Sequence, residues 1–199
     1  ALGRDVHSRY RLYFPDPAQH VADPAPDRAS VLGGGSPTAA LARTINYTGV
    51  LEHALRDLSA WVEEGTPAPH STNYTIDDDS QVVLPLTGRR GIQPVVHLSV
   101  DGGDRADIQI GGSVEFDASI LVPEGGGQVV KVEWDFLGTG DYPVSQEASG
   151  VMDPVQASHT YSASGTYFPV VRVTPQREGD PGDAYARVQN IAPVRVVVT

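Results

Sequence analysis

The sequence predicts a mainly β protein: an antiparallel β-sandwich over residues 92–199, preceded by a loop-rich N-terminal segment, residues 1–91, with one amphipathic helix. Two observations support this prediction. Every candidate element from Gln93 onward has the alternation of a strand, and glycine-rich turns separate these elements. Only residues 45–63 repeat apolar side chains at the three- and four-residue spacing of a helix. Short strands at this spacing are typical of a sandwich of about 100 residues.

The N-terminal segment carries one weak strand signal and one helix signal. Residues 9–14, RYRLYF, alternate weakly, and we expect a short strand there before a run rich in proline. The helix at 45–63 has an apolar face that includes Leu51, Leu55, Leu58 and Trp61. Because a long apolar stripe left in water invites association, we expect this face to fold onto the rest of the chain, with pairing to a second copy as the alternative.

The sandwich strands are expected at residues 93–100, 113–119, 129–136, 155–161, 166–174 and 184–198. The stretch VKVEWDFLGTGDYP, residues 130–143, shows the pattern most clearly. Trp134 shares its parity with the apolar neighbours, whereas Lys131, Glu133 and Asp135 share the other parity. A strand of this kind buries one face and leaves the other in water. We therefore expect Trp134 to lie in the core.

Composition restricts the partners and the chemistry. The net charge of −11 repels phosphate backbones and anionic lipid, which argues against nucleic acid and membrane surfaces as partners. The chain has no cysteine, which excludes disulfides, thiolate metal sites and a cysteine nucleophile. It begins at Ala1 without an initiator methionine, and we expect a piece of a larger secreted protein.

Three motifs connect the C-terminal part to a family. VEFDAS at 114–119, VEWDFLGTGDYP at 132–143 and HTYSASGTYFPVVRVT at 159–174 resemble, in order and spacing, motifs of the polycystic kidney disease (PKD) domain. The resemblance implies an immunoglobulin-like sandwich over roughly residues 93–199, with Trp134 and Tyr167 in the core and His159 at a strand end. Pro169 departs from the pattern because it removes a ladder donor, so we expect a bulge or irregular segment there.

A second, shorter resemblance concerns the N-terminal segment. RYRLYFPDPAQHVAD resembles the last strand and catalytic-histidine loop of an α/β-hydrolase, and INYTGVLEHALRDLSAWVEEGTPAP resembles its closing helix. On this resemblance His20 is the catalytic base of a triad and Asp16 is a loop residue before it. A solvated loop histidine explains His20 equally well. The chain has no Gly-x-Ser-x-Gly nucleophile motif, so any triad would be incomplete here.

No cofactor or metal site is predicted. Asp77, Asp78 and Asp79 are adjacent, whereas a calcium loop alternates its ligands, so we interpret them as a solvated acidic loop. Asp135 and Asp141 flank a glycine-rich loop that could hold calcium, but no further carboxylate follows at ligand spacing.

Two functions follow from these patterns. The first is a non-catalytic accessory module, extracellular or on the cell surface, for protein or carbohydrate contact or for domain spacing. The second is the C-terminal portion of an esterase-like hydrolase that supplies His20 to an upstream hydrolase domain. The sequence alone leaves both open.

Overall fold

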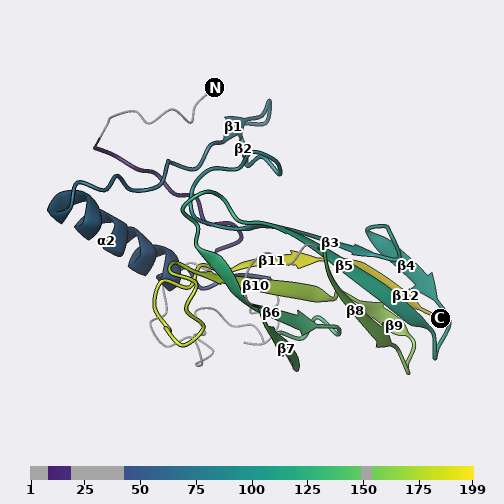
Figure 1. Cartoon of the computed structure of the whole chain (residues 1–199). Helices are drawn as coiled ribbons and strands as arrows, with labels where there is room; N and C mark the ends of the chain where they lie inside the picture. Colours follow the sequence, from purple (N-terminus) through teal and green to yellow (C-terminus); the bar gives the residue numbers. More distant parts are fainter. Residues whose placement is uncertain (1–8, 19–42, 149–153) are drawn as a thin grey trace, which may run out of the picture.

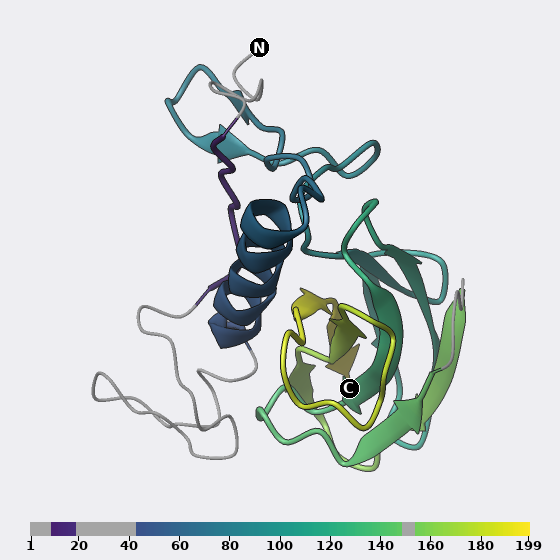
Figure 2. The same ribbon diagram turned by 60° about the vertical axis from the view of Figure 1, so that its left-hand side comes forward.

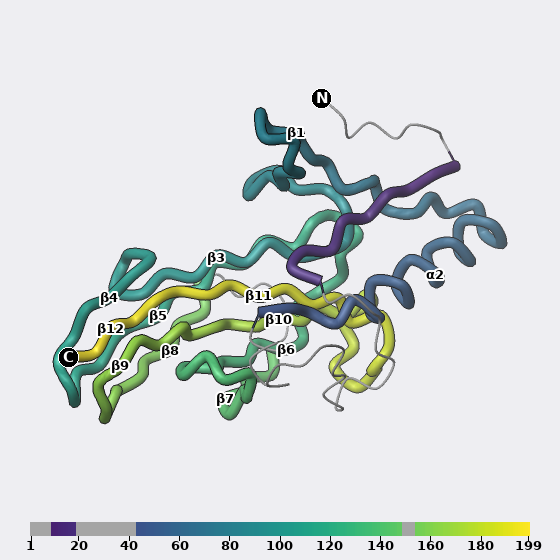
Figure 3. Tube along the Cα trace, turned by 180° about the vertical axis from the view of Figure 1, so that it is seen from behind, coloured from purple at the N-terminus to yellow at the C-terminus, as the bar shows by residue number. Residues whose placement is uncertain are grey.

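A computed structural model describes residues 9–18, 43–148 and 154–199 (Figure 1). In the views of Figures 1 and 3, the β-sandwich is elongated, and helix α2 lies beside the end that is remote from the C-terminus. The hairpin β1–β2 lies to one side of the sandwich near this end, and Figure 2 shows it above both α2 and the sandwich. The expected mainly β sandwich, preceded by one helix in a loop-rich segment, is confirmed.

The elements in chain order are α2 (Thr48–Glu63), β1 (Thr75–Ile76), β2 (Val82–Val83), β3 (Val95–Val100), β4 (Arg105–Ile108), β5 (Ser113–Leu121), β6 (Gln128–Asp135), β7 (Val144–Glu147), β8 (Val155–Thr160), β9 (Gly165–Tyr167), β10 (Val170–Gln176), β11 (Asn190–Pro193) and β12 (Arg195–Val198).

The sandwich has two layers. One layer is the antiparallel sheet β3-β5-β8. The other layer combines β11-β10-β6-β7 with β4-β12-β9, because the chain runs directly from β9 into β10 and from β11 into β12. Pro169 lies in the break between β9 and β10, and Val194 lies in the break between β11 and β12. The N–H of Val194 donates to the carbonyl of Pro169 (3.0 Å), which joins these two breaks. The irregularity expected at Pro169 is therefore confirmed.

Trp134 lies in the core between the layers, as expected, with 1% of its surface exposed. Its ring stacks on Phe136 with the centroids 5.9 Å apart, and Phe116 from the other layer lies 5.5 Å from Phe136. The hydroxyl of Tyr161 donates to the carbonyl of Phe136 (2.8 Å), which fixes the end of β6 against β8. Tyr167 is partly buried against this core.

The second face of β6 is largely buried, whereas we expected it to face solvent. Glu133 is 5% exposed because Lys131 and Arg172 pair with its two carboxylate oxygens at 2.7 and 2.8 Å. Asp135 is 1% exposed because the turn after β6 folds over it. Its oxygens accept three backbone N–H groups of residues 137, 138 and 140. Polar side chains on this parity are thus buried with partners.

Two strands of the sandwich were not predicted from the sequence. The strand β4 is only four residues long and pairs in parallel with β12, so the sandwich is not wholly antiparallel. The strand β7 is exposed along its whole length and pairs with β6. Its sequence therefore lacks the alternation of apolar residues that would predict a strand. Short edge strands carry little periodic signal because they bury little surface.

The prediction of a strand at residues 9–14 is wrong. This segment runs beside residues 68–72 through mixed contacts: the N–H of Leu12 and that of Phe14 donate to the hydroxyls of Ser71 and Thr72. A backbone hydrogen bond from the N–H of Thr72 to the carbonyl of Leu12 (2.8 Å) also joins them. The neighbouring run PAP at 67–69 has two prolines without N–H donors, so no regular ladder forms.

The helix is also oriented differently from the expectation. It begins at Thr48 rather than at 45, because Ile45 pairs with residues 17 and 18. Its apolar stripe lies in water, and its exposed fractions are 52% for Leu51, 67% for Leu55, 53% for Leu58 and 77% for Val62. The expectation that the predicted face folds onto the chain is wrong for its three leucines, since the buried residues are Gly49, Val50, His53 and Asp57. Its fourth member, Trp61, is partly buried and packs against the guanidinium of Arg11, 4.5 Å from the ring centroid.

The buried position of Trp134 leads to a stability prediction. Trp134→Ala should lower the free energy of unfolding by about 3–5 kcal/mol, because it opens a cavity between the two layers. Urea unfolding followed by circular dichroism measures this change. Leu137→Ala is the control, since Leu137 is 50% exposed and its truncation should change stability little. A loss below about 1 kcal/mol for Trp134→Ala would mean that the residue is not a core anchor.

Candidate functional site

Described residues on both sides of the segment that carries His20 are held by hydrogen bonds. His20 itself lies outside the described residues, so its predicted role as a catalytic base stays a prediction. On the entering side, the buried amide of Gln93 accepts the N–H of Asp16 (3.0 Å) and donates to the carbonyl of Asp16 (2.9 Å). On the returning side, the N–H of Ile45 donates to the carbonyl of Pro17 (2.7 Å), and Ile45 is buried beside Val170. Residues 16–17 are thereby joined to Gln93 and to Ile45.

The polar face of α2 is buried against the loop between β10 and β11, residues 177–189. His53 is fully buried, and its Nδ1 lies 2.9 Å from Oδ2 of Asp57, one helical turn later. The other oxygen of Asp57 accepts from Nε (2.8 Å) and Nη2 (2.7 Å) of Arg177. The residues at i and i+4 thus face the same side of the helix, and one arginine from a distant loop closes the group.

Further polar contacts surround this group. Arg56 pairs with Glu178 and with Asp183 at 3.1 Å each. The carboxylate of Glu52 accepts the N–H of Ala186 (2.8 Å). Within the loop, the buried Gln176 accepts the N–H groups of Glu178 (2.7 Å) and of residue 180 (2.9 Å), which holds the loop in the shape that meets the helix.

Gly49 allows the closest approach of the helix to the loop. A Cβ atom placed on Gly49 would overlap the backbone carbonyl of Arg187. Any larger residue must therefore push the first turn of the helix away from the sandwich. The buried neighbours Val50, Ile92 and Val188 form a small apolar cluster beside this contact, with Tyr13 and Tyr47 packed against it.

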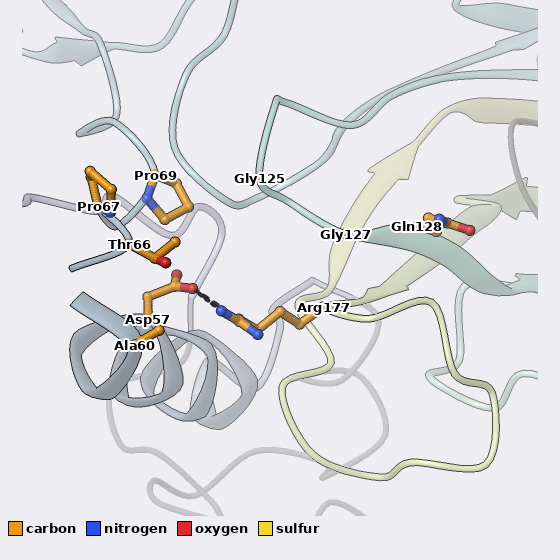
Figure 4. Close-up of a pocket in the computed structure, with 9 residues that line it drawn as sticks. All are labelled: Asp57, Ala60, Thr66, Pro67, Pro69, Gly125, Gly127, Gln128 and Arg177. Atoms are coloured by element: carbon orange, nitrogen blue, oxygen red, sulfur yellow. Dashed lines mark hydrogen bonds and ion pairs between the residues drawn. The ribbon is translucent and has the colours of Figure 1, made fainter. Parts of the chain in front are cut away.

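A cavity of about 430 Å³ lies beside the ion pair (Figure 4). Its walls come from α2, from the extended run after it, from the turn before β6 and from Arg177. The lining residues are Asp57, Ala60, Thr66, Pro67, Pro69, Gly125, Gly127, Gln128 and Arg177. Both charged groups of the lining already satisfy each other, so the cavity offers a ligand little unpaired charge.

Charge pairing outweighs burial at Asp57. Burial alone would raise the pKa of this carboxyl, but the hydrogen bonds from His53 and Arg177 lower its pKa below the ordinary value of 3.8. The carboxylate is therefore the stable form in the folded protein. His53 and Asp57 have the geometry of a base with its orienting acid, but the Nε2 atom of His53 is buried and has no hydrogen-bond partner. A base in this position cannot reach a substrate, so the group joins the helix to the sandwich.

The other predicted candidates also have structural roles. Asp77 caps the β1–β2 turn by accepting the N–H groups of Asp79 (3.0 Å) and Gln81 (2.8 Å). Asp135 directs both oxygens at the backbone donors of the turn after β6, which is unfavourable for a cation. Across 9–18, 43–148 and 154–199, no three histidine or acidic side chains gather as metal ligands would. No helix in the described part of the chain is long and apolar enough to span a membrane.

Sequence reasoning missed the group of His53, Asp57 and Arg177. A histidine and an acid at i and i+4 on the polar face of a helix are a detectable signal, but they suggest only a local pair. The third member is 120 residues away, and no periodicity in the sequence connects it to the helix.

The lowered pKa of Asp57 predicts how the helix contact responds to acid. A depressed pKa contributes stability above the unfolded-state pKa, and this contribution is lost as the pH falls through the folded-state pKa, below about pH 4. Asp57→Asn should therefore be less stable than wild type at neutral pH, with a difference that shrinks on acidification below about pH 4.

Urea unfolding at a series of pH values measures this difference. Asp78→Asn is the matched control, because Asp78 is exposed in the hairpin turn and its variant should follow the wild-type profile. A difference between Asp57→Asn and wild type that stays constant across the acidic range would contradict the assigned ion pair.

Comparison with known proteins gives distant likenesses only. No protein-family model matches the chain, and no curated protein matches it significantly. Among solved structures, the CARDB domain of the PF1109 protein from Pyrococcus furiosus, solved in complex with di-metal ions, is 19% identical with a TM-score of 0.35. That match covers 54% of this chain and 96% of that domain.

A PKD domain of an M14-like peptidase from Thermoplasmatales archaeon SCGC AB-540-F20 is 18% identical with a TM-score of 0.33. The match covers 53% of this chain and 92% of that domain. Likenesses at these TM-scores carry no argument about ligand or activity. The chain's own sheets and buried aromatic residues form the expected PKD-like β-sandwich, which is preceded by a docked helix.

Proposed function

We propose that this chain is a non-catalytic accessory module of a larger extracellular or cell-surface protein, and that it holds a neighbouring domain at a fixed distance and orientation. The observation that carries this proposal is the clamp between the N-terminal segment and the sandwich. Arg177 and Asp57 join α2 to the β10–β11 loop, and Gln93, two residues before β3, binds the backbone of Asp16. A flexible linker would make none of these contacts.

The clamp favours domain spacing over ligand contact as the main role of the module. The loop at 177–189 occupies one end of the sandwich, where such domains present loops for recognition. Here its acidic side chains Glu178 and Asp183 bind Arg56 of the helix. A loop that binds another part of the same chain in this way holds that part in a set orientation relative to the sandwich. Contact with an extracellular polymer or protein would then fall to other exposed surfaces.

A second function is favoured by the hydrogen bonds of Asp16 and Pro17, which precede His20 in the sequence. As the C-terminal portion of an esterase-like hydrolase, the module would supply His20 to a triad whose serine and acid lie in an upstream domain. A base must be positioned accurately to act. Asp16 and Pro17, four and three residues before His20 in the sequence, are held by Gln93 and by Ile45, and these contacts support the alternative.

The spacer proposal predicts a single distance between helix and sandwich. The chain has no cysteine, so Glu63→Cys and Ser119→Cys place two spin labels selectively on exposed positions of α2 and β5. Pulsed electron paramagnetic resonance on samples diluted with unlabelled protein should give one narrow distance distribution. A broad distribution, as for a flexible tether, would contradict the proposal.

Gly49→Val in the same labelled chain should broaden the distribution, because its side chain cannot fit against Arg187. Ser59→Val is the matched control, since it puts the same β-branched residue on an exposed part of the helix.

The hydrolase alternative predicts that the isolated chain does not turn over esters. A histidine without its nucleophile offers only the general-base rate of a free imidazole. Hydrolysis of p-nitrophenyl acetate by wild type and by His20→Ala should therefore be equal and should not saturate. Saturable turnover that His20→Ala abolishes would mean that the chain contains a complete site. If an upstream domain fused in its natural order gains turnover that His20→Ala does not affect, the alternative is wrong.

A further inference from the structure

The exposed apolar stripe of α2 has the spacing of a helix-pairing seam. Leu51, Leu55, Leu58 and Val62 follow one another at intervals of four, three and four residues. This places them in one line along the helix, as at the a and d positions of two heptads. They are exposed because the opposite face, which includes Gly49, His53 and Asp57, is buried against the sandwich.

We propose that this stripe pairs two copies of the chain in an antiparallel, two-fold symmetric helix contact. The intervals four, three and four read the same in both directions. Leu51 of one copy would then meet the partner's Val62, and Leu55 would meet the partner's Leu58. A self-complementary pattern is what a two-fold interface requires, because the same surface serves both subunits.

The flanks of the stripe suit close helix packing. Ala54 and Ser59 border the stripe and are small and uncharged, which allows helix axes to approach to about 8–10 Å. Two charged groups near the stripe are engaged elsewhere: Glu52 accepts the N–H of Ala186, and Arg56 pairs with Glu178. On the flank of Ala54, the guanidinium of Arg11 lies over the ring of Trp61, 4.5 Å from its centroid, so this cation lies beside the seam and is engaged there.

Charge decides between antiparallel and parallel pairing. The part of α2 between Gly49 and Asp57 holds the sandwich, so a parallel pair would place both sandwiches at the same end. Each chain carries a net charge of −11, and bringing two such bodies together is unfavourable. The antiparallel pair separates them. The remaining repulsion is screened by salt, so the association should strengthen as ionic strength rises.

The interface is small, because only four large side chains from each copy are buried. Interfaces at the low end of the size range are weak and reversible, so we expect a dissociation constant on the order of 10–100 µM. Other exposed apolar groups, on the hairpin β1–β2 and just after it, are not part of the seam; among them, Leu86 is 65% exposed. Leu86 provides a matched control.

Sedimentation velocity of the whole chain from roughly 5 to roughly 300 µM tests the proposal across the range of a weak interface. Wild type should shift from monomer to dimer over this range, and the shift should occur at lower concentration in about 0.5 M than in about 0.05 M salt. Leu55→Glu should weaken dimerisation about tenfold or more, because it puts a charge in the seam. Leu86→Glu should leave it unchanged.

Thermal unfolding of dilute Leu55→Glu should match that of wild type, since Leu55 is exposed in the monomer. This measurement separates a lost contact from a lost fold. A monomer at every concentration would overturn the proposal, because the stripe would then not pair two copies of the chain. A dimer that Leu55→Glu does not weaken would also overturn it. Neither result affects the proposed spacer function, which depends on the opposite face of the helix.

Discussion

The ion pair between Asp57 and Arg177 is the interaction on which the arrangement of the N-terminal segment depends. It joins a helix to a loop 120 residues later in the chain, and its carboxylate is nearly excluded from water. A buried carboxylate is unfavourable unless it is paired and hydrogen-bonded, and Asp57 has both His53 and Arg177 as partners. If the arginine were absent, the buried carboxylate would keep only its contact with His53. The helix and the loop therefore stabilise one another's position.

The orientation of α2 follows from this constraint. The polar face can be buried only because the β10–β11 loop offers matching groups, and Gly49 brings the backbones close enough for them to meet. Once this face is inside, helix geometry places Leu51, Leu55 and Leu58 on the outside. One long-range contact thus produces both a rigid link to the sandwich and an apolar surface available to another molecule.

The sequence predicted the sandwich well because its signals are local. The parity of Trp134 within β6, the glycine-rich turns and the break at Pro169 each depend on residues adjacent in the chain. The helix itself was predicted for the same reason. Its buried face was not, since amphipathicity gives two faces and does not say which one has a partner. The role of Glu133 was missed similarly, because its partner Arg172 is on another strand. His20 was proposed from resemblance alone, and its position lies outside the described residues.

The orientation of the helix is tested most directly by the reactivity of single cysteines in this naturally cysteine-free chain. Val50 is 6% exposed and Leu55 is 67% exposed. In dilute native protein, Leu55→Cys should react with a thiol reagent at nearly the rate of an unfolded control, whereas Val50→Cys should be strongly protected until the protein unfolds. If Leu55→Cys were the protected position and Val50→Cys the reactive one, the helix would bury its apolar stripe, and the polar clamp of Asp57 and Arg177 could not be what holds it.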